Sequence, residues 1–159
     1  MNAKLLNGNT LHAESSAEVG AAAHEVYRFL ADYPNGHLRI VPPQYFANLK
    51  VEEGGYGEGT VLDFDMRAFG STQHARVRVS EPEPGRRLIE TEQRTGAVTS
   101  FNIEPLGTER SRVTIAIDMP VRAGLLGWIE RLVTGSYFRR VFSAELVRLD
   151  SVMTARLVG

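Results

Sequence analysis

Two glutamates on one predicted strand are the residues whose type and spacing best suit chemistry. Glu90 and Glu92 stand two positions apart, so on a strand both project from the same face, together with Leu88. If Leu88 faces an interior cavity, both carboxyl groups line that cavity as well. A buried carboxyl group has a raised pKa and can act as a general acid or base.

The opposite orientation of this strand is the one that the sequence favours. Asp and Glu side chains are rarely buried unless they have a partner. We therefore expect Ile89 to face the interior and both glutamates to face solvent. Tyr27, in a predicted helix, is a third candidate for proton transfer.

The metal-ligating residue types are few and scattered. The chain has no cysteine and four histidines, which are His12, His24, His37 and His74. They form no HxxxH or HExxH arrangement, so we expect no metal site. His74 is explained as a cross-strand partner of Asp65 or Arg67 on a solvated sheet face, and His37 as a surface residue of a short helix.

The composition is that of a globular domain, with 43% hydrophobic and 23% charged residues. A formal net charge of −1 provides no basic footprint for nucleic acid, so nucleic acid is not an expected partner. Without cysteine there is no disulfide, and residues 1–10 lack the apolar core of a signal peptide. We expect residues 1–10 to be a flexible segment, residues 11–159 to be one domain, and the protein to be cytoplasmic.

Hydrophobic periodicity predicts a strand, two short helices and then a run of strands. Apolar residues alternate over residues 11–19, and helical spacing follows over residues 21–31 until the helix-ending residues at 32–36. A second short helix is expected over residues 37–41. Six further strands are predicted at residues 45–52, 60–68, 71–80, 87–93, 98–104 and 112–119. The turn residues between them favour antiparallel pairing of sequence neighbours.

The register of one hairpin follows from the two faces of its strands. Leu62, Phe64 and Met66 alternate with Asp63 and Asp65, and on the next strand apolar residues alternate with His74, Arg76 and Arg78. An even-length turn at Phe69-Gly70 pairs apolar with apolar and acid with base, whereas an odd-length turn would mix the faces. We expect Leu62, Phe64 and Met66 to be buried, and Asp63 and Asp65 to be exposed.

The last apolar stripe predicts one long helix from residue 125 to residue 157. Its apolar members recur at three- and four-residue spacing and include Leu125, Trp128, Ile129, Leu132, Phe138, Val141, Phe142, Leu146, Leu149, Val152 and Met153. Charged residues, Glu145 among them, are expected mainly on the opposite face. Such a helix would be roughly 45 Å long at ~1.5 Å per residue and would cover the apolar face of the sheet. Gly127 and Gly135 each weaken it by about 1 kcal/mol.

The order of these elements resembles the START-like (SRPBCC, helix-grip) superfamily, and the polyketide cyclase/dehydrase branch in particular. The segments that carry the resemblance are "AAHEVYRFLAD" at residues 22–32, Gly57–Thr60, Pro84–Leu88, Arg112–Ile115 and Phe142–Ala155. The resemblance spans residues 11–157 and implies an α+β fold in which a curved, seven-stranded antiparallel sheet wraps around the long C-terminal helix. It also implies a cavity between sheet and helix, used by family members to carry lipids, hormones and polyketides or to catalyse cyclisation. His37 would lie beside its mouth, where it could contact a polar ligand group.

These expectations favour a noncatalytic protein that binds or carries a small hydrophobic, lipid- or polyketide-like molecule. The ligand-binding residues expected on the sheet are Phe64, Met66, Val77, Phe101, Ile115 and Ile117, and those expected on the helix are Trp128, Tyr137, Phe138, Phe142, Leu146 and Leu149. Trp128 and Tyr137 would act as movable lids. Two alternatives stay open. One is a cyclase or dehydratase that uses Glu90, Glu92 or Tyr27 without a metal or organic cofactor, and the other is a protein-interaction module whose groove is filled.

Residues 121–140 combine glycines, aromatic residues and arginines. A segment of this composition could contact a membrane surface. Packing against the sheet is the expected role. The sequence leaves the oligomeric state open.

Overall fold

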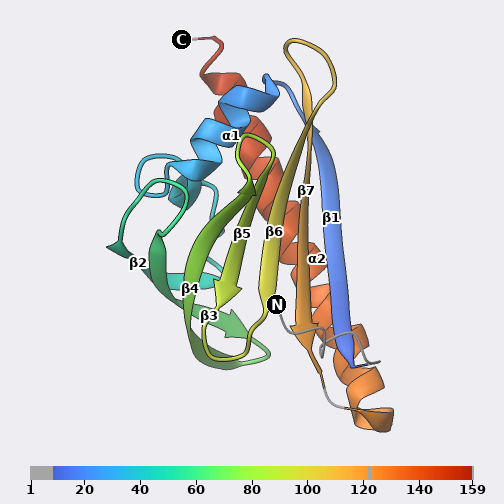
Figure 1. The fold of residues 1–159 in the computed structure, drawn as a ribbon. Coiled ribbons are helices and arrows are strands. Elements are labelled where there is room, and N and C mark those ends of the chain that lie inside the picture. Colours follow the sequence, from blue (N-terminus) through green and yellow to red (C-terminus); the bar gives the residue numbers. More distant parts are fainter. Residues whose placement is uncertain (1–8, 122, 159) are drawn as a thin grey trace.

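The fold is a curved antiparallel sheet that partly encloses one long helix (Figure 1). The structure is a computed structural model that describes residues 9–121 and 123–158, without the side chains of residues 126 and 128. The strands in this part of the chain are β1 (Thr10–Val19), β2 (Phe46–Glu53), β3 (Val61–Ala68), β4 (Ser71–Glu83), β5 (Arg87–Glu92), β6 (Val98–Pro105) and β7 (Ser111–Pro120). The helices are α1 (Ala23–Ala31), the short 3-10 helix η2 (His37–Arg39) and α2 (Gly124–Ala155). The predicted α+β helix-grip architecture is confirmed.

The sheet has the strand order β1-β7-β6-β5-β4-β3-β2. From β2 to β7 each strand pairs with its sequence neighbour, as predicted. β1 instead pairs with β7, from Thr10 opposite Pro120 to Val19 opposite Ser111. α1 and η2 belong to the connection from β1 to β2, which lie at opposite edges of the sheet.

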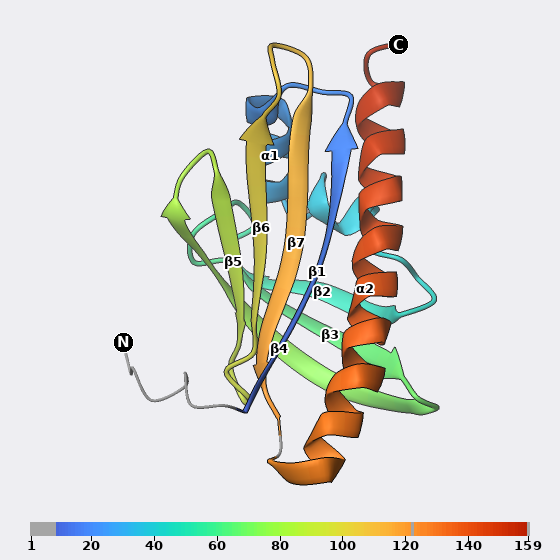
Figure 2. The same cartoon turned by 90° about the vertical axis from the view of Figure 1, so that its right-hand side faces the viewer.

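The sheet is strongly curved, and Figure 2 shows β3 and β4 sweeping toward the N-terminal half of α2 while β1 runs beside the helix. The pairing of β2 with β3 shifts register twice, between Ala47 and Lys50 and between Val51 and Glu53. Asn48, inside the first shift, has a positive φ of 54°. Such bulges bend a strand and increase its twist. They let the β2–β3 edge curve around the space in front of α2.

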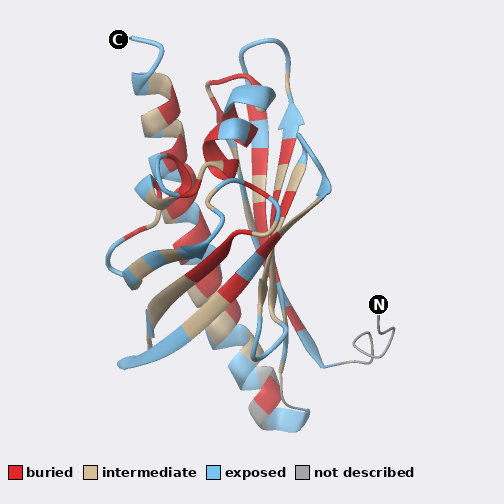
Figure 3. Cartoon of the chain, turned by 60° about the vertical axis from the view of Figure 1, so that its left-hand side comes forward, coloured by how far each residue is buried: buried red, intermediate tan, exposed pale blue. Residues whose placement is uncertain are grey.

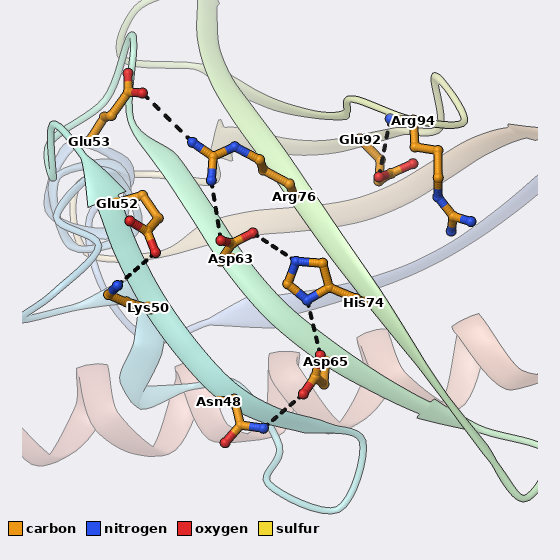
Figure 4. Close-up of polar contacts among 10 residues, drawn as sticks. All are labelled: Asn48, Lys50, Glu52, Glu53, Asp63, Asp65, His74, Arg76, Glu92 and Arg94. Atoms are coloured by element: carbon orange, nitrogen blue, oxygen red, sulfur yellow. Dashed lines mark hydrogen bonds and ion pairs between the residues drawn. The ribbon is translucent and has the colours of Figure 1, made fainter.

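The predicted register of the β3–β4 hairpin is confirmed. Leu62 pairs with Val77 and Asp63 with Arg76, around a two-residue turn at Phe69-Gly70 in which both residues have positive φ. The charged face carries alternating ion pairs, with Arg76 Nη1 3.2 Å from Asp63 Oδ2 and His74 Nδ1 3.1 Å from Asp65 Oδ1 (Figure 4). These pairs shield the two aspartates, which are only partly exposed rather than fully solvated.

The apolar face of β3 departs from the expected burial. Leu62 is buried, but Phe64 and Met66 are half-buried. They remain partly accessible because the helix does not cover this part of the sheet. The residues form part of a cavity wall instead of a closed core.

α2 is continuous across Gly127 and Gly135, and its buried stripe faces the sheet (Figure 3). It packs mainly along β1, where Ser15 Oγ donates a hydrogen bond to the Arg139 carbonyl and the Gly20 amide donates one to Asp150 Oδ1. The prediction that the apolar stripe packs on the sheet is wrong for its first half, because Leu125, Ile129 and Leu132 are exposed. No described helix is long and apolar enough to cross a bilayer.

Candidate functional site: a cavity with a polar inner end

A cavity of about 170 Å³ lies between the curved sheet and α2. An engineered apolar cavity of about 150 Å³ accommodates benzene, so this volume suits a compound with one ring. Seven of the predicted ligand-binding residues line it, and they are Phe64, Met66, Val77, Phe101, Ile117, Phe138 and Phe142. Its wall is therefore mostly apolar and aromatic.

The other predicted site residues lie elsewhere. Ile115, Leu146 and Leu149 are buried in the core and do not reach the cavity. The side chain of Trp128 lies outside the described residues. Tyr27 also lies away from the cavity, because its hydroxyl donates a 2.5 Å hydrogen bond to Glu81 Oε1.

A second groove of about 570 Å³ adjoins the cavity. The two spaces share Met66, Gln73, Met119 and Phe138. Tyr137 lines this groove and donates a 2.6 Å hydrogen bond to the Arg67 carbonyl, which connects α2 to β3. A ligand larger than the cavity could extend past Met66 and Phe138 into this groove.

Glu90 and Glu92 both line the cavity, which is the opposite of the orientation that the sequence favoured. Each has a partner. Tyr33 Oη donates a 2.9 Å hydrogen bond to Glu90 Oε1, and Glu92 accepts hydrogen bonds from the amide and hydroxyl of Thr95 in its own turn. Partial burial opposes ionisation of Glu92, but the hydrogen bonds outweigh it and lower the pKa of this carboxyl. These partners remove the objection to burying the two carboxylates.

His37 and Glu90 form the polar inner end of the cavity, and the buried Tyr33 contacts both of them. The Tyr33 and His37 rings stack with centroids 4.6 Å apart, and the His37 ring meets Phe101 edge-on at 4.8 Å. His37 Nδ1 lies 2.8 Å from the Leu30 carbonyl, while Nε2 lies 3.8 Å from Glu90 Oε1. The expectation of a surface histidine is wrong, since His37 is 3% exposed. Burial and the neighbouring Glu90 raise the pKa of Tyr33 well above 10, so its hydroxyl stays a donor.

The turn after α1 positions this pair of rings. Asp32 Oδ1 accepts a hydrogen bond from the Asn35 amide, and the Asp32 carbonyl accepts bonds from the amides of Gly36 and His37. A Cβ at Gly36 would lie 2.1 Å from the Phe29 carbonyl oxygen, so only glycine fits there. In the sequence, the pattern Asp32-x-x-Asn35-Gly36 indicates only a helix end. In the structure, the same residues also turn Tyr33 and His37 inward.

Glu145 on α2 is the functional candidate that sequence reasoning missed. It was expected on the solvated face, but it is 5% exposed and lines the cavity. No hydrogen bond to its carboxyl group is found among the described residues. Burial, and then the negative charge of Glu90, raise the pKa of Glu145 well above its usual value near 4.5. The spacing of three residues from Phe142 and four to Leu149 is the signal that could have placed it on the buried stripe.

This arrangement combines an apolar wall with opposed carboxyl groups. Burial and the negative charge of Glu90 raise the pKa of Glu145 and so favour its protonated form, which can donate a proton or a hydrogen bond. Pairs of titratable groups in different environments are the usual basis of acid and base roles. The geometry therefore permits polar ligand recognition and also proton transfer.

Comparison with known proteins agrees with the fold. The family model for polyketide cyclase / dehydrase and lipid transport matches residues 10–154. The chain therefore belongs to this family. No curated protein sequence matches it.

Solved structures with the same fold are distant in sequence. The KanY protein is 22% identical with a TM-score of 0.80, covering 92% of this chain and 99% of that one. The Zhui aromatase/cyclase from Streptomyces sp. R1128 is 21% identical with a TM-score of 0.72, covering 93% and 96%. A START superfamily protein from Mycobacterium smegmatis is 16% identical with a TM-score of 0.69, covering 89% and 99%. At these identities the likeness concerns the fold.

Proposed function

We propose that this protein binds and carries a small, mostly apolar molecule, with the ligand's polar group placed beside Glu90 and Glu145. The observation that carries the proposal is the mostly apolar and aromatic cavity of about 170 Å³ whose lining includes the carboxyl groups of Glu90 and Glu145. Ligand sites are typically concave and apolar, with a few converging polar groups that set orientation. Lipid transport in the family's description supports carriage. An open cavity argues against a protein-interaction module whose groove is filled. We propose that the protein is located in the cytoplasm.

Dye binding tests this proposal. The neutral fluorescent dye N-phenyl-1-naphthylamine, whose three rings would extend from the cavity into the adjoining groove, should bind with about one-to-one stoichiometry and be displaced by small aromatic compounds. Phe142→Trp fills the cavity and should weaken binding by about tenfold or more, because Phe142 contacts the space directly. Leu132→Trp is the matched control, since Leu132 is exposed on the same helix and lines neither space.

The outcomes separate clearly. Unchanged dye binding by Phe142→Trp would place the ligand elsewhere and overturn the proposal. Native mass spectrometry of freshly purified protein adds a direct measurement, because a carried molecule should appear as an added mass that is lost on denaturation.

Acid–base catalysis on a polyketide-like substrate is the second candidate. The observation that favours it is the buried Glu145, whose pKa is raised well above its usual value by burial and then by the charge of Glu90. A general acid of this kind could protonate a leaving hydroxyl during dehydration or a carbonyl oxygen during cyclisation. With a poly-β-ketone substrate, mass spectrometry should detect loss of water, and Glu145→Gln should abolish that loss while dye binding persists.

A further inference from the structure

The two fixed donors at the inner end of the cavity, Tyr33 Oη and His37 Nδ1, are already used by Glu90 and the Leu30 carbonyl, whereas acceptors of Glu90 and His37 line the space. Because the Leu30 carbonyl only accepts, His37 Nδ1 must carry the hydrogen of their 2.8 Å contact. In the neutral imidazole, Nε2 is then an acceptor that faces Glu90. Glu90 receives one donor, the Tyr33 hydroxyl. Glu145, buried and without a hydrogen bond among the described residues, lines the same space.

In the described part of the chain, no lysine or arginine forms an ion pair with Glu90. Two other cavity-lining residues can carry positive charge, His74 and Arg94. His74 contacts Asp63 and Asp65 on the outer face of the hairpin, and Arg94 is exposed in the turn after β5. Figure 4 shows His74 among the charged side chains of the β3–β4 hairpin and Arg94 beside Glu92. Among the described residues, His37 alone forms an ion-pair contact with Glu90.

We propose that the molecule carried in this cavity is a small apolar amine, and that its protonated nitrogen binds between Glu90, Glu145 and His37. This inference rests on the proposed function, which it narrows to a ligand class. An ammonium group brings donors and a positive charge to a place that has acceptors and a negative charge. A buried carboxylate is stable when it is paired and hydrogen-bonded.

The same geometry disfavours carboxylic acids. An ionised acid at this position would meet the charge of Glu90 in surroundings of low dielectric constant, where repulsion is stronger than in water. An alcohol supplies only one donor and no charge. The expected order of affinity is therefore amine, then alcohol, then carboxylate, for ligands with the same ring.

Isothermal titration with three matched compounds tests this order at neutral pH. The probes are 2-phenylethylamine, 2-phenylethanol and 3-phenylpropionate. We expect the amine to bind at least tenfold more tightly than the alcohol and the carboxylate to bind most weakly. In Glu90→Gln the amine should lose its advantage over the alcohol. Glu104→Gln, which neutralises an exposed carboxylate on β6, should leave the order unchanged.

Glu145→Gln provides a second and independent measurement. The other titratable groups that line the cavity with Glu145 are His37 from η2, His74 from β4, Glu90 and Glu92 from β5 and Arg94 from the turn after β5, and Tyr33 donates to Glu90. Binding of an ammonium should favour ionisation of Glu145, whose proton then passes to solvent. Titrations in buffers of different ionisation enthalpy should therefore detect proton release in the unaltered protein and less of it in Glu145→Gln.

Failure of this inference differs from failure of the proposed function. If the dye and 2-phenylethanol bind but the amine has no advantage, the amine assignment is wrong and carriage stands. The inference is also wrong if Glu90→Gln keeps the amine preference. If neither dye nor any probe binds, the proposed function itself is overturned.

Discussion

Three glutamates around one cavity differ because their surroundings differ. Glu92 has a lowered pKa because Thr95 donates hydrogen bonds that outweigh its partial burial. Glu145 has a raised pKa because it is buried without such donors and faces the charge of Glu90. Glu90 accepts the Tyr33 hydroxyl. The residue type alone therefore says little about which carboxyl group is a neutral acid.

Glu145→Gln should stabilise the protein at neutral pH. A carboxyl whose folded-state pKa is raised binds its proton more tightly in the folded state, so its contribution to the free energy of unfolding is fully present below about pH 4.5 and is lost as pH rises toward the folded pKa. Each unit of pKa shift corresponds to about 1.4 kcal/mol. Glutamine cannot ionise and removes this loss. Urea unfolding from pH 4 to pH 8 should show a flatter profile than that of the unaltered protein. An unchanged profile would contradict the burial of Glu145.

Tyr33→Phe should weaken both stability and polar ligand binding. It removes the donor to Glu90, and leaving a buried acceptor unsatisfied costs about 1–3 kcal/mol. Tyr27→Phe is the matched control, because Tyr27 donates to Glu81 away from the cavity. Both variants should lower the unfolding free energy in chemical denaturation, but only Tyr33→Phe should change the affinity for 2-phenylethanol. If the two variants bind 2-phenylethanol with equal affinity, Tyr33 does not contribute to ligand binding.

At the scale of elements, the turn after α1 decides where Tyr33 and His37 point. Gly36→Ala should destabilise the protein by about 1–3 kcal/mol, because the added Cβ lies 2.1 Å from a backbone oxygen that cannot move easily. Gly135→Ala is the control with the opposite sign. There the Cβ meets only the flexible Arg139 side chain at 3.3 Å, and alanine in a helix stabilises by about 0.5–1 kcal/mol. Thermal unfolding of both variants checks the prediction, which fails if the two shift in the same direction.

The C-terminal half of α2 is held by its buried stripe. Leu146→Ala should lower the unfolding free energy by about 2–5 kcal/mol, because Leu146 is 2% exposed where the helix packs on the sheet. Val147→Ala, at the neighbouring exposed position, should change it by less than about 0.5 kcal/mol. Chemical denaturation measures both. A loss below about 1 kcal/mol for Leu146→Ala would mean that this stripe does not hold the helix in place.

At the scale of the whole molecule, α2 lies along β1 and does not cover the inner faces of β3 to β6, where the cavity lies. The Tyr137 hydroxyl connects the helix to β3 at the groove beside this opening. Burial, and then the neighbouring Tyr45, raise the pKa of Tyr137 to about 12, so the hydroxyl donates throughout the neutral range. The sequence predicts Tyr137 as a movable lid. For Tyr137 to move, its hydrogen bond to the Arg67 carbonyl must break.

Tyr137→Phe should speed ligand exchange. Loss of the hydrogen bond to the Arg67 carbonyl makes separation of α2 from β3 easier, so association and dissociation of the dye should both accelerate, with a smaller change in affinity. Stopped-flow fluorescence measures both rates. Tyr45→Phe keeps the neighbouring aromatic ring and serves as the control. Rates that match those of the unaltered protein would show that the ligand enters by another path.

Local patterns in the sequence determined the strands, the long helix and the β3–β4 register, because alternation and turn residues act over a few positions. The turn at Phe69-Gly70 was sufficient to pair Asp63 with Arg76. The pairing of β1 with β7 and the inward orientation of Glu90 required the tertiary structure. Glu90 faces the cavity because Tyr33, 57 residues earlier in the chain, reaches its carboxyl group. Whether a charge can be buried depends on partners brought together by folding, and neither periodicity nor residue type contains that information.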